Sequence, residues 1–266
     1  MKRLRELADM SGRVAVVTGG SGTLGEAFCE SLAELGTTVC ILDISEERAQ
    51  RCAQRISEKF SVAASAFTAD ISIESQAERA IRQVLAKHGR LDALVNNAAY
   101  SPRSLPADGL ALRSQSLAQW DTQLDVILTG TFLVTRTCAE ALAAHGNGAV
   151  VNVASIYGLV GAVPSLYSGT MMVNPAYYAA GKGGVVQLTR YLATLLAPAV
   201  RVNCIAPGGV RAQQPEPFHE RYKARKPLGR MADAEDMKGA LAFLATDLSS
   251  YVTGQILAVD GGWTAW

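Results

Sequence analysis

This sequence lacks the features that mark several broad classes of protein. Its formal net charge is only +1, so it has no excess of basic side chains of the kind that nucleic-acid-binding domains carry. No window approaches the roughly 18 consecutive apolar residues of a membrane-spanning helix. No apolar stretch of signal-peptide length follows the charged segment Met1–Glu6. We therefore expect a soluble protein that binds neither nucleic acid nor a membrane.

Cysteine is scarce and shows no close pairing. The five cysteines form no C-x-x-C motif, and their odd number argues against a disulfide framework. Cys29, Cys40 and Cys204 fall in predicted helices or strands, where a cysteine usually acts as a small buried hydrophobic residue. We expect a cytoplasmic protein without a metal site.

Apolar runs alternate with amphipathic segments along the chain. Most runs lack polar alternation, as parallel strands do when both faces of their sheet are buried. The runs predict strands at Val14–Thr18, Thr38–Asp43, Ala64–Ala69, Ala93–Asn96, Val150–Ala154, Val200–Ala206 and Ile256–Val259. The amphipathic segments predict helices at Ser45–Phe60, Ile73–His88, Leu117–His145, Tyr177–Leu196 and Asp233–Leu244.

This repetition predicts an α/β fold with a doubly wound parallel sheet of about seven strands. No linker, low-complexity tract or internal repeat interrupts the chain, so we expect residues 1–266 to form a single domain. Three stretches are expected to be irregular insertions: 100–116, 162–175 and the proline- and charge-rich 213–227. Within the last, the basic cluster Arg221–Lys226 predicts a solvated loop or a short helix.

A glycine-rich turn follows the first predicted strand and opens a helix. Glycines let the backbone turn tightly and approach a pyrophosphate, and a helix start offers free N–H groups to it. A plain turn between strand and helix is the alternative. As a phosphate-binding turn it would contact the cofactor through Gly19, Ser21, Gly22, Thr23, Leu24 and Gly25.

The second predicted strand ends at Asp43. A carboxylate there can accept hydrogen bonds from both ribose hydroxyls of an adenosine, and it would repel a 2′-phosphate. Two like charges ~4 Å apart at an effective dielectric of ~20 cost about 4 kcal/mol. No arginine follows before Arg48, so the sequence favours NAD over NADP. In the alternative interpretation, Asp43 only caps the next helix.

Tyr178 and Lys182 lie four residues apart in a predicted helix and so share one face. An ammonium beside a phenol favours the phenolate, so we predict that Lys182 lowers the pKa of Tyr178 toward neutrality. Such a tyrosine can exchange a proton with an alcohol or ketone. Tyr177 is the rival phenol, but its fourth neighbour is Gly181.

Together with the glycine-rich turn, several blocks fall in the order typical of one family. They are Asp70-Ile71, Asn96-Asn97-Ala98-Ala99, Val151-Asn152-Val153-Ala154-Ser155, Tyr178 with Lys182, Arg201-Val202-Asn203, Pro207-Gly208-Gly209, Thr253-Gly254-Gln255 and Asp260-Gly261-Gly262. Over nearly its full length the chain resembles the short-chain dehydrogenase/reductase family, which implies a Rossmann-type fold.

The resemblance implies a role for each matching residue. Ser155 would orient the substrate oxygen, Tyr178 would act as general acid/base, and Lys182 would also bind the nicotinamide ribose. The resemblance further implies cofactor contacts from Asp70 and Ile71 at the adenine, from Asn96, Asn97 and Ala98, and from Pro207, Gly208 and Val210 at the nicotinamide side.

The chain departs from the family pattern at four places. The turn reads T-G-x-x-G-x-x-G, a spacing like that of sugar-nucleotide epimerases and dehydratases. Ile127 stands where an asparagine usually kinks the helix and holds a relay water. Ala212 stands near the position where the family often has a threonine, and the neighbouring Arg211 is either solvated or faces an anionic group on the substrate. The stretch between Ser155 and Tyr178 is longer than usual, and its extra segment is either a pocket wall or a surface or subunit contact.

The insertion, the N-P-x-x-Y-x-x-x-K motif and the final Trp263–Trp266 resemble bacterial members from sugar and surface-glycan pathways. We therefore expect an NAD-dependent oxidoreductase that interconverts a secondary alcohol and a ketone on a sugar, amino sugar or polyol. The alternatives are a cofactor-retaining sugar epimerase or dehydratase, and a non-catalytic NAD-binding module. The family resemblance also implies a homotetramer, with a dimer as the second choice, formed through the helices at Leu117–His145 and Tyr177–Leu196.

Overall fold

Seven strands form one parallel sheet in the computed structural model, which describes residues 1–100, 112–170 and 172–266. Their order across the sheet is β3-β2-β1-β4-β5-β6-β7. The strands are β1 (Val14–Thr18), β2 (Thr38–Asp43), β3 (Ala64–Thr68), β4 (Ala93–Asn96), β5 (Gly148–Val153), β6 (Val200–Pro207) and β7 (Ile256–Val259). The predicted α/β fold with a doubly wound parallel sheet is confirmed, and every strand lies within two residues of its predicted bounds.

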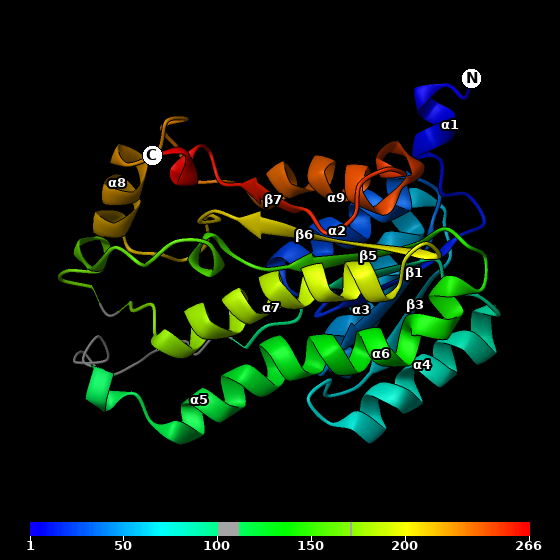
Figure 1. Ribbon diagram of the computed structural model, residues 1–266, viewed down its shortest axis with the longest axis horizontal. Coiled ribbons are helices and arrows are strands. Elements are labelled where there is room, and N and C mark those ends of the chain that lie inside the picture. Colours follow the sequence, from blue (N-terminus) through cyan, green and yellow to red (C-terminus); the bar gives the residue numbers. More distant parts are fainter. Residues whose placement is uncertain (101–111, 171) are drawn as a thin grey trace.

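Helices cover both faces of the sheet, and Figure 1 shows α4, α6 and α7 on one side with α2 and α9 on the other. One layer holds α2 (Thr23–Glu34), α3 (Glu46–Phe60) and α9 (Lys238–Ala245). The other holds α4 (Glu74–His88), α6 (Gly130–Ala143) and α7 (Ala176–Leu195). Every residue of β1, β4 and β5 is buried, because these central strands are covered on both faces.

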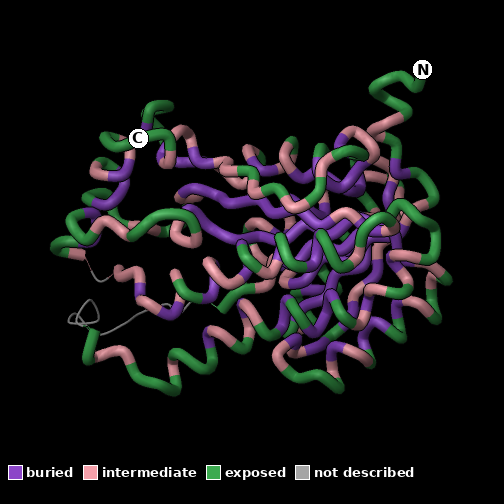
Figure 2. Tube along the Cα trace, in the orientation of Figure 1, coloured by how far each residue is buried: buried purple, intermediate pink, exposed green. Residues whose placement is uncertain are grey.

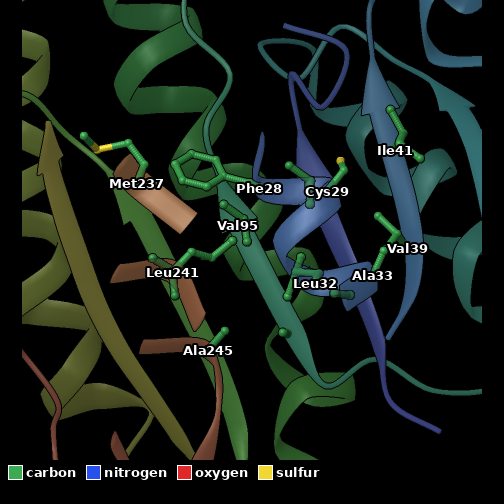
Figure 3. Close-up of a cluster of buried hydrophobic side chains, with 14 of the residues drawn as sticks. Phe28, Cys29, Leu32, Ala33, Val39, Ile41, Val95, Met237, Leu241 and Ala245 are labelled. Atoms are coloured by element: carbon green, nitrogen blue, oxygen red, sulfur yellow. The ribbon is translucent and has the colours of Figure 1, made fainter. Parts of the chain in front are cut away.

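The core on the first face is built around α2. Figure 3 shows Phe28 and Leu32 of this helix near Leu241 of α9 and Val95 of β4, all of them fully buried. The buried strands lie inside the molecule in Figure 2, whereas the N-terminal helix α1 (Leu4–Ala8) buries none of its residues. All five cysteines are free and buried, as predicted for three of them.

Capping residues begin and end two of the helices at the predicted positions. Ser45 caps α3, and its hydroxyl accepts a hydrogen bond from the Arg48 N–H at 3.5 Å. Gly89 ends α4 with φ +71°, a left-handed conformation that glycine adopts without steric cost.

The helix predicted at Leu117–His145 is not continuous. It consists of α5 (Leu117–Leu124), a π-helical turn at Asp125–Thr129, and α6. The Gly130 N–H donates to the Asp125 carbonyl, five residues back, so one extra residue is accommodated in the turn. By length and composition alone, 117–143 could cross a membrane, which is weak evidence for a single stretch; 44% of its most apolar window is buried within the fold.

The three predicted insertions contain more structure than expected. Within 213–227 lies a helix, α8 (Glu216–Ala224), whose Phe218 and Tyr222 are buried one turn apart. Short 3-10 turns occur at Leu112–Ser114 and Pro164–Leu166, while 101–111 and residue 171 lie outside the described residues. The helix predicted at Asp233–Leu244 begins as a 3-10 turn, Ala234–Met237, before α9.

Candidate active site

Two connected cavities lie at the carboxyl ends of the strands. The first, here called the β2 cavity, measures about 590 Å³ and is lined by Gly19, Asp43 and Asp70 among others. The second, the α7 cavity, measures about 660 Å³ and is lined by Ser155, Tyr178 and Lys182 among others. Five residues line both cavities, so the two form one cleft: Thr23, Leu24, Asn97, Ala99 and Tyr100.

The glycine-rich turn lies at the middle of this cleft. α2 begins at Thr23 with Gly22 as its N-cap, so the start of the helix faces both cavities. A Cβ on Gly25 would lie 2.1 Å from the Gly19 carbonyl oxygen, and one on Gly19 would lie 2.8 Å from the Ala98 Cα. These two positions need glycine because the turn packs directly on the helix and on the segment after β4. A helix start that is open to a cleft in this way suits a phosphate group.

Asp43 forms one wall of the β2 cavity, and it is held firmly. Its carboxylate accepts hydrogen bonds from the Ser21 hydroxyl at 2.5 Å and from the Ser45 N–H at 3.1 Å. The Arg48 guanidinium approaches it at 3.4 Å and borders the same cavity. Ser45, not Asp43, is the N-cap of α3, so capping alone does not explain the position of this carboxylate.

Most of the cofactor contacts predicted from the sequence lie on the cleft wall. Those that line it are Gly19, Gly22, Thr23, Leu24, Asp43, Asp70, Ile71, Asn97, Ala98, Lys182, Pro207, Gly208 and Val210. Sequence reasoning missed others that line it, among them Ile44, Tyr100 and Gln123. The glycine-rich blocks marked the turn, but no sequence signal marked these side chains.

Three predicted contacts, Ser21, Gly25 and Asn96, do not line either cavity. The Asn96 amide donates to Thr135 at 2.8 Å and to Asn152 at 2.9 Å, so it ties β4 to α6 and β5 in the interior. Ser21 is turned toward Asp43, and Gly25 is covered by the turn itself. It is the Asn97 side chain that reaches the turn, donating to the carbonyls of Thr18 and Gly19 at 3.0 Å each.

The structure brings Ser155, Tyr178 and Lys182 together in the α7 cavity. Ser155 follows β5, and its hydroxyl accepts a hydrogen bond from the Tyr157 N–H at 3.2 Å. Tyr178 and Lys182 lie one turn apart on α7, with the ammonium 5.9 Å from the centre of the phenol ring. The ammonium donates to the Val153 carbonyl at 2.6 Å, which fixes it at the end of β5.

The predicted lowering of the Tyr178 pKa by Lys182 is wrong for this structure. Burial raises the pKa of the Tyr178 hydroxyl, and a hydrogen bond with Ser155 offsets only part of that rise. Lys182 does not lower it because its ammonium is directed at the Val153 carbonyl instead. Burial also lowers the pKa of Lys182 to about 8. Burial therefore shifts both groups toward their neutral forms, although Lys182 still carries its proton at neutral pH.

Ile127 replaces a polar side chain with an apolar one beside this group. It is 1% exposed and packs with Ala154, Val185 and the Tyr178 ring. A Cβ on Gly181 of α7 would lie 3.2 Å from its Cγ2, so the two helices are in close contact here. Ile127 lies within the π-helical turn Asp125–Thr129.

The extra segment before Tyr178 forms part of the cavity wall. Tyr167, Met172 and Asn174 line the α7 cavity, and the Tyr167 hydroxyl is hydrogen-bonded to that of Tyr157 at 2.8 Å. This outcome favours the pocket-wall alternative over a surface loop. α8 completes the wall with Phe218 and Tyr222. The Tyr222 ring stacks on that of Trp263, with 4.6 Å between the ring centres.

Arg211 does not face the cavity. Its side chain is largely exposed and pairs with Asp233 at 2.8 Å, so the solvated alternative holds.

Comparisons with known proteins identify the relatives of this chain. A family model described as enoyl-(acyl carrier protein) reductase matches residues 20–264. The chain is 35% identical to a 3-oxoacyl-[acyl-carrier-protein] reductase, FabG, of Aquifex aeolicus (strain VF5), over 95% of this chain and 98% of that protein. It is 33% identical to an NADP-dependent mannitol dehydrogenase of Hypocrea jecorina (strain ATCC 56765 / BCRC 32924 / NRRL 11460 / Rut C-30), over 98% and 96%. Among solved structures, NAD⁺-bound xylitol dehydrogenase superposes with a TM-score of 0.84 and 28% identity, over 95% of this chain and 99% of that one.

Proposed function

The chain belongs to the short-chain dehydrogenase/reductase family, and we propose that it is an NAD-dependent dehydrogenase of a polyol or sugar. The relatives named above are nicotinamide-dependent dehydrogenases and reductases. Hydride transfer between a nicotinamide cofactor and an alcohol or ketone is the reaction common to these relatives. The observation that supports catalysis by this chain is the convergence of Ser155, Tyr178 and Lys182 at one end of the cleft.

Each of the three side chains has a distinct task in this proposal. Ser155 holds the substrate oxygen by hydrogen bonding. For oxidation Tyr178 first loses its own proton to solvent, and the phenolate then takes the substrate's hydroxyl proton. For reduction the neutral phenol, which is hydrogen-bonded to Ser155, donates its proton to the ketone oxygen. Lys182 is fixed on the Val153 carbonyl and presents its remaining N–H donors to the cofactor ribose. The bound nicotinamide supplies the hydride acceptor or donor.

The cleft fits a dinucleotide by three of its features. The start of α2 is open to both cavities and suits the pyrophosphate. Asp43 borders the β2 cavity with a buried carboxylate that can accept ribose hydroxyls. Asp70 and Ile71 border the same cavity on the side assigned to the adenine. The preference for NAD rests on Asp43, although a mannitol-specific relative uses NADP.

The proposed substrate class rests on the lining of the α7 cavity and on two relatives. Hydroxyl and amide groups from Ser155, Tyr157, Tyr167, Asn174 and Gln123 line this cavity, and they can pair with several substrate hydroxyls. Mannitol and xylitol are the substrates named for two similar proteins. The FabG relative instead acts on an acyl carrier protein conjugate.

A cofactor-retaining epimerase or dehydratase is the second candidate, and the spacing of Gly19, Gly22 and Gly25 favours it. Such an enzyme returns the hydride to its substrate. Net accumulation of NADH during turnover of a polyol therefore separates the two candidates. A non-catalytic NAD-binding module would release no NADH and would also tolerate replacement of Tyr178.

Replacement of Tyr178 by phenylalanine tests the proposal. Tyr178→Phe removes only the hydroxyl, so we expect kcat to fall by about 10²- to 10⁴-fold while the Kd for NAD stays unchanged. Turnover is followed by NADH absorbance with a panel of sugars and polyols, and NAD binding by a calorimetric titration. Tyr177→Phe is the matched control and keeps most of its activity. Equal turnover of the wild type and Tyr178→Phe contradicts the proposal.

We also propose that residues 1–266 act as one cytoplasmic domain that assembles into a homotetramer, with a dimer as the second choice. Exposed apolar side chains on α7 support assembly, with Tyr191 and Leu195 each 59% exposed. Phe132 on α6 and Leu257 on β7 are also more than a third exposed. Patches of this kind usually mark protein interfaces.

A further inference from the structure

Two buried amide atoms, on residues that line the α7 cavity, have no hydrogen-bond partner among the described residues. They are Gln123 Oε1 and Asn174 Nδ2. Gln123 is only 1% exposed. Buried polar atoms in folded proteins are nearly always paired, because an unpaired one has lost its hydrogen bonds to water without replacement. Of the five such atoms found in the described chain, these two line the same cavity.

The fold places both amides at the side of the cavity formed by α5 and the start of α7. Gln123 lies at the end of α5, and Asn174 lies two residues before α7 begins. α5 approaches α7 closely because α7 presents glycine there: a Cβ on Gly181 would lie 3.4 Å from the Leu124 side chain. The Gln115 side chain, just before α5, accepts a hydrogen bond from the Ala176 N–H at 2.9 Å. The two segments are therefore held together by contacts close to both amides.

The chemistry of the two atoms is complementary to a hydroxyl group. The Gln123 oxygen accepts a hydrogen bond and the Asn174 nitrogen donates one, while a hydroxyl can do both. Other amides of the cavity are already paired: Gln214 accepts from the Ala212 N–H at 2.7 Å and donates to the Val210 carbonyl at 2.8 Å. Gln123 and Asn174 are thus distinguished from Gln214 by their unpaired ends.

The charge of the cavity narrows the class of ligand further. Among the described residues that line it, Lys182 is the only charged side chain. Its ammonium is already directed at the Val153 carbonyl. A phosphate or carboxylate on the substrate would therefore lack a dedicated cationic partner within this described lining.

We propose that Gln123 and Asn174 determine substrate specificity by binding a second hydroxyl of a neutral polyol, remote from the carbon that is oxidised. This inference rests on the proposed dehydrogenase function. It favours free polyols over phosphorylated or nucleotide-linked sugars. The amides hold the substrate and take no part in proton or hydride transfer.

Isosteric replacement of the two amides tests this assignment. Gln123→Met and Asn174→Leu keep the approximate side-chain volume and remove the polar ends. NADH formation by the purified full-length protein is measured with the polyols mannitol and xylitol. Cyclohexanol, which has one hydroxyl, and mannitol 1-phosphate, which carries a phosphate, are the comparison substrates. We expect each variant to lose about tenfold in kcat/KM for the preferred polyol, the size of one hydrogen bond, and to keep its kcat/KM for cyclohexanol. Gln187→Met, at an exposed position on α7, is the control and should match the wild type.

Stability gives an independent measurement on the same variants. Because the unpaired amide atoms cost free energy in the folded state, their apolar replacements should raise the Tm of the cofactor-free protein. Equal losses toward mannitol and cyclohexanol, or a wild-type preference for mannitol 1-phosphate, would overturn this inference and leave the dehydrogenase function standing. Absence of NADH formation with every alcohol would overturn the proposed function itself.

Discussion

Asp43 is the residue whose charge should decide between the two nicotinamide cofactors. It is 6% exposed, borders the β2 cavity, and is held by Ser21 and Ser45 in one orientation. A 2′-phosphate beside it would meet a fixed negative charge. Arg48 borders the same cavity and could bind that phosphate if the carboxylate were removed.

Asp43→Asn should therefore shift the preference toward NADP. We expect the ratio of kcat/KM for NAD to that for NADP to fall by between ten- and a thousandfold, since like-charge repulsion of up to about 4 kcal/mol is removed. Steady-state kinetics with both cofactors measure this ratio. Glu47→Gln is the control, because Glu47 is exposed and pairs with Arg51 instead. A ratio that is unchanged in Asp43→Asn would show that the carboxylate does not select the cofactor.

Because of Lys182, the free energy of unfolding changes with pH in the alkaline range. Its folded-state pKa of about 8 lies below the ordinary value of 10.5 because the ammonium is buried. Below about pH 8 the folded and unfolded states both hold the proton, and burial of the charge destabilises the folded state. Between pH 8 and 10.5 the folded state releases the proton first, so its stability rises with pH.

The free energy of unfolding of the wild type, relative to Lys182→Met, should consequently increase between pH 7 and pH 10. The expected gain is on the order of 3 kcal/mol at most. Urea unfolding of both proteins at the two pH values gives the difference, and other titrating groups cancel between them. A difference that stays constant with pH would mean that Lys182 titrates normally in the folded protein.

Individual residues were predictable from sequence where a motif fixes them. Tyr178, Lys182 and Asp43 lie on the cleft as predicted, because helical spacing and strand ends constrain their positions. Asn96 and Asn97 were not distinguishable, since neighbours on a strand point to opposite sides and the sequence does not show which side is the cleft. Gln123 carried no signal, because its burial depends on the packing of α5 against α7.

Among the elements, the turn between β1 and α2 depends most strictly on its sequence. A Cβ at Gly25 would meet the Gly19 carbonyl oxygen at 2.1 Å, which the backbone cannot accommodate without moving. Gly239 on α9 offers the opposite case, since a Cβ there would meet nothing within 4 Å.

Gly25→Ala should lower the free energy of unfolding by about 1–3 kcal/mol and weaken NAD binding. Gly239→Ala, the matched control, should raise stability by up to about 1 kcal/mol, because alanine favours a helix over glycine. Thermal unfolding and a calorimetric NAD titration give both quantities. Unweakened NAD binding by Gly25→Ala would show that the cofactor does not depend on the shape of this turn.

Elements were predictable where hydrophobic periodicity is local. The strands follow from their apolar runs, whereas α8 overlaps the Arg221–Lys226 cluster, for which the sequence left a solvated loop and a short helix as alternatives. Its buried Phe218 and Tyr222 are held by Tyr167 and Trp263, contacts distant in sequence. The π-helical turn at Asp125–Thr129 was not part of the single continuous helix predicted at Leu117–His145, although the family pattern marked Ile127 as a position where the helix is usually kinked.

For the whole molecule, the exposed apolar side chains of α7 argue for assembly. We expect light scattering after size exclusion to give four chains per particle, or two if only the helical interface forms. Leu195→Glu places a charge in that interface and should reduce the number of chains. Leu4→Glu, in the exposed helix α1, should leave it unchanged. A monomeric wild type would contradict the assembly proposed for this chain.

The division of the cleft along the chain has an evolutionary consequence. Every described residue that lines the β2 cavity lies between Gly19 and Val126, whereas most of those in the α7 cavity lie between Val153 and Tyr222. Gene duplicates could therefore acquire new substrates mainly through changes after Val153, with Gln123 as an exception in the earlier stretch. The adenosine side of coenzyme binding would remain under separate selection in that earlier stretch.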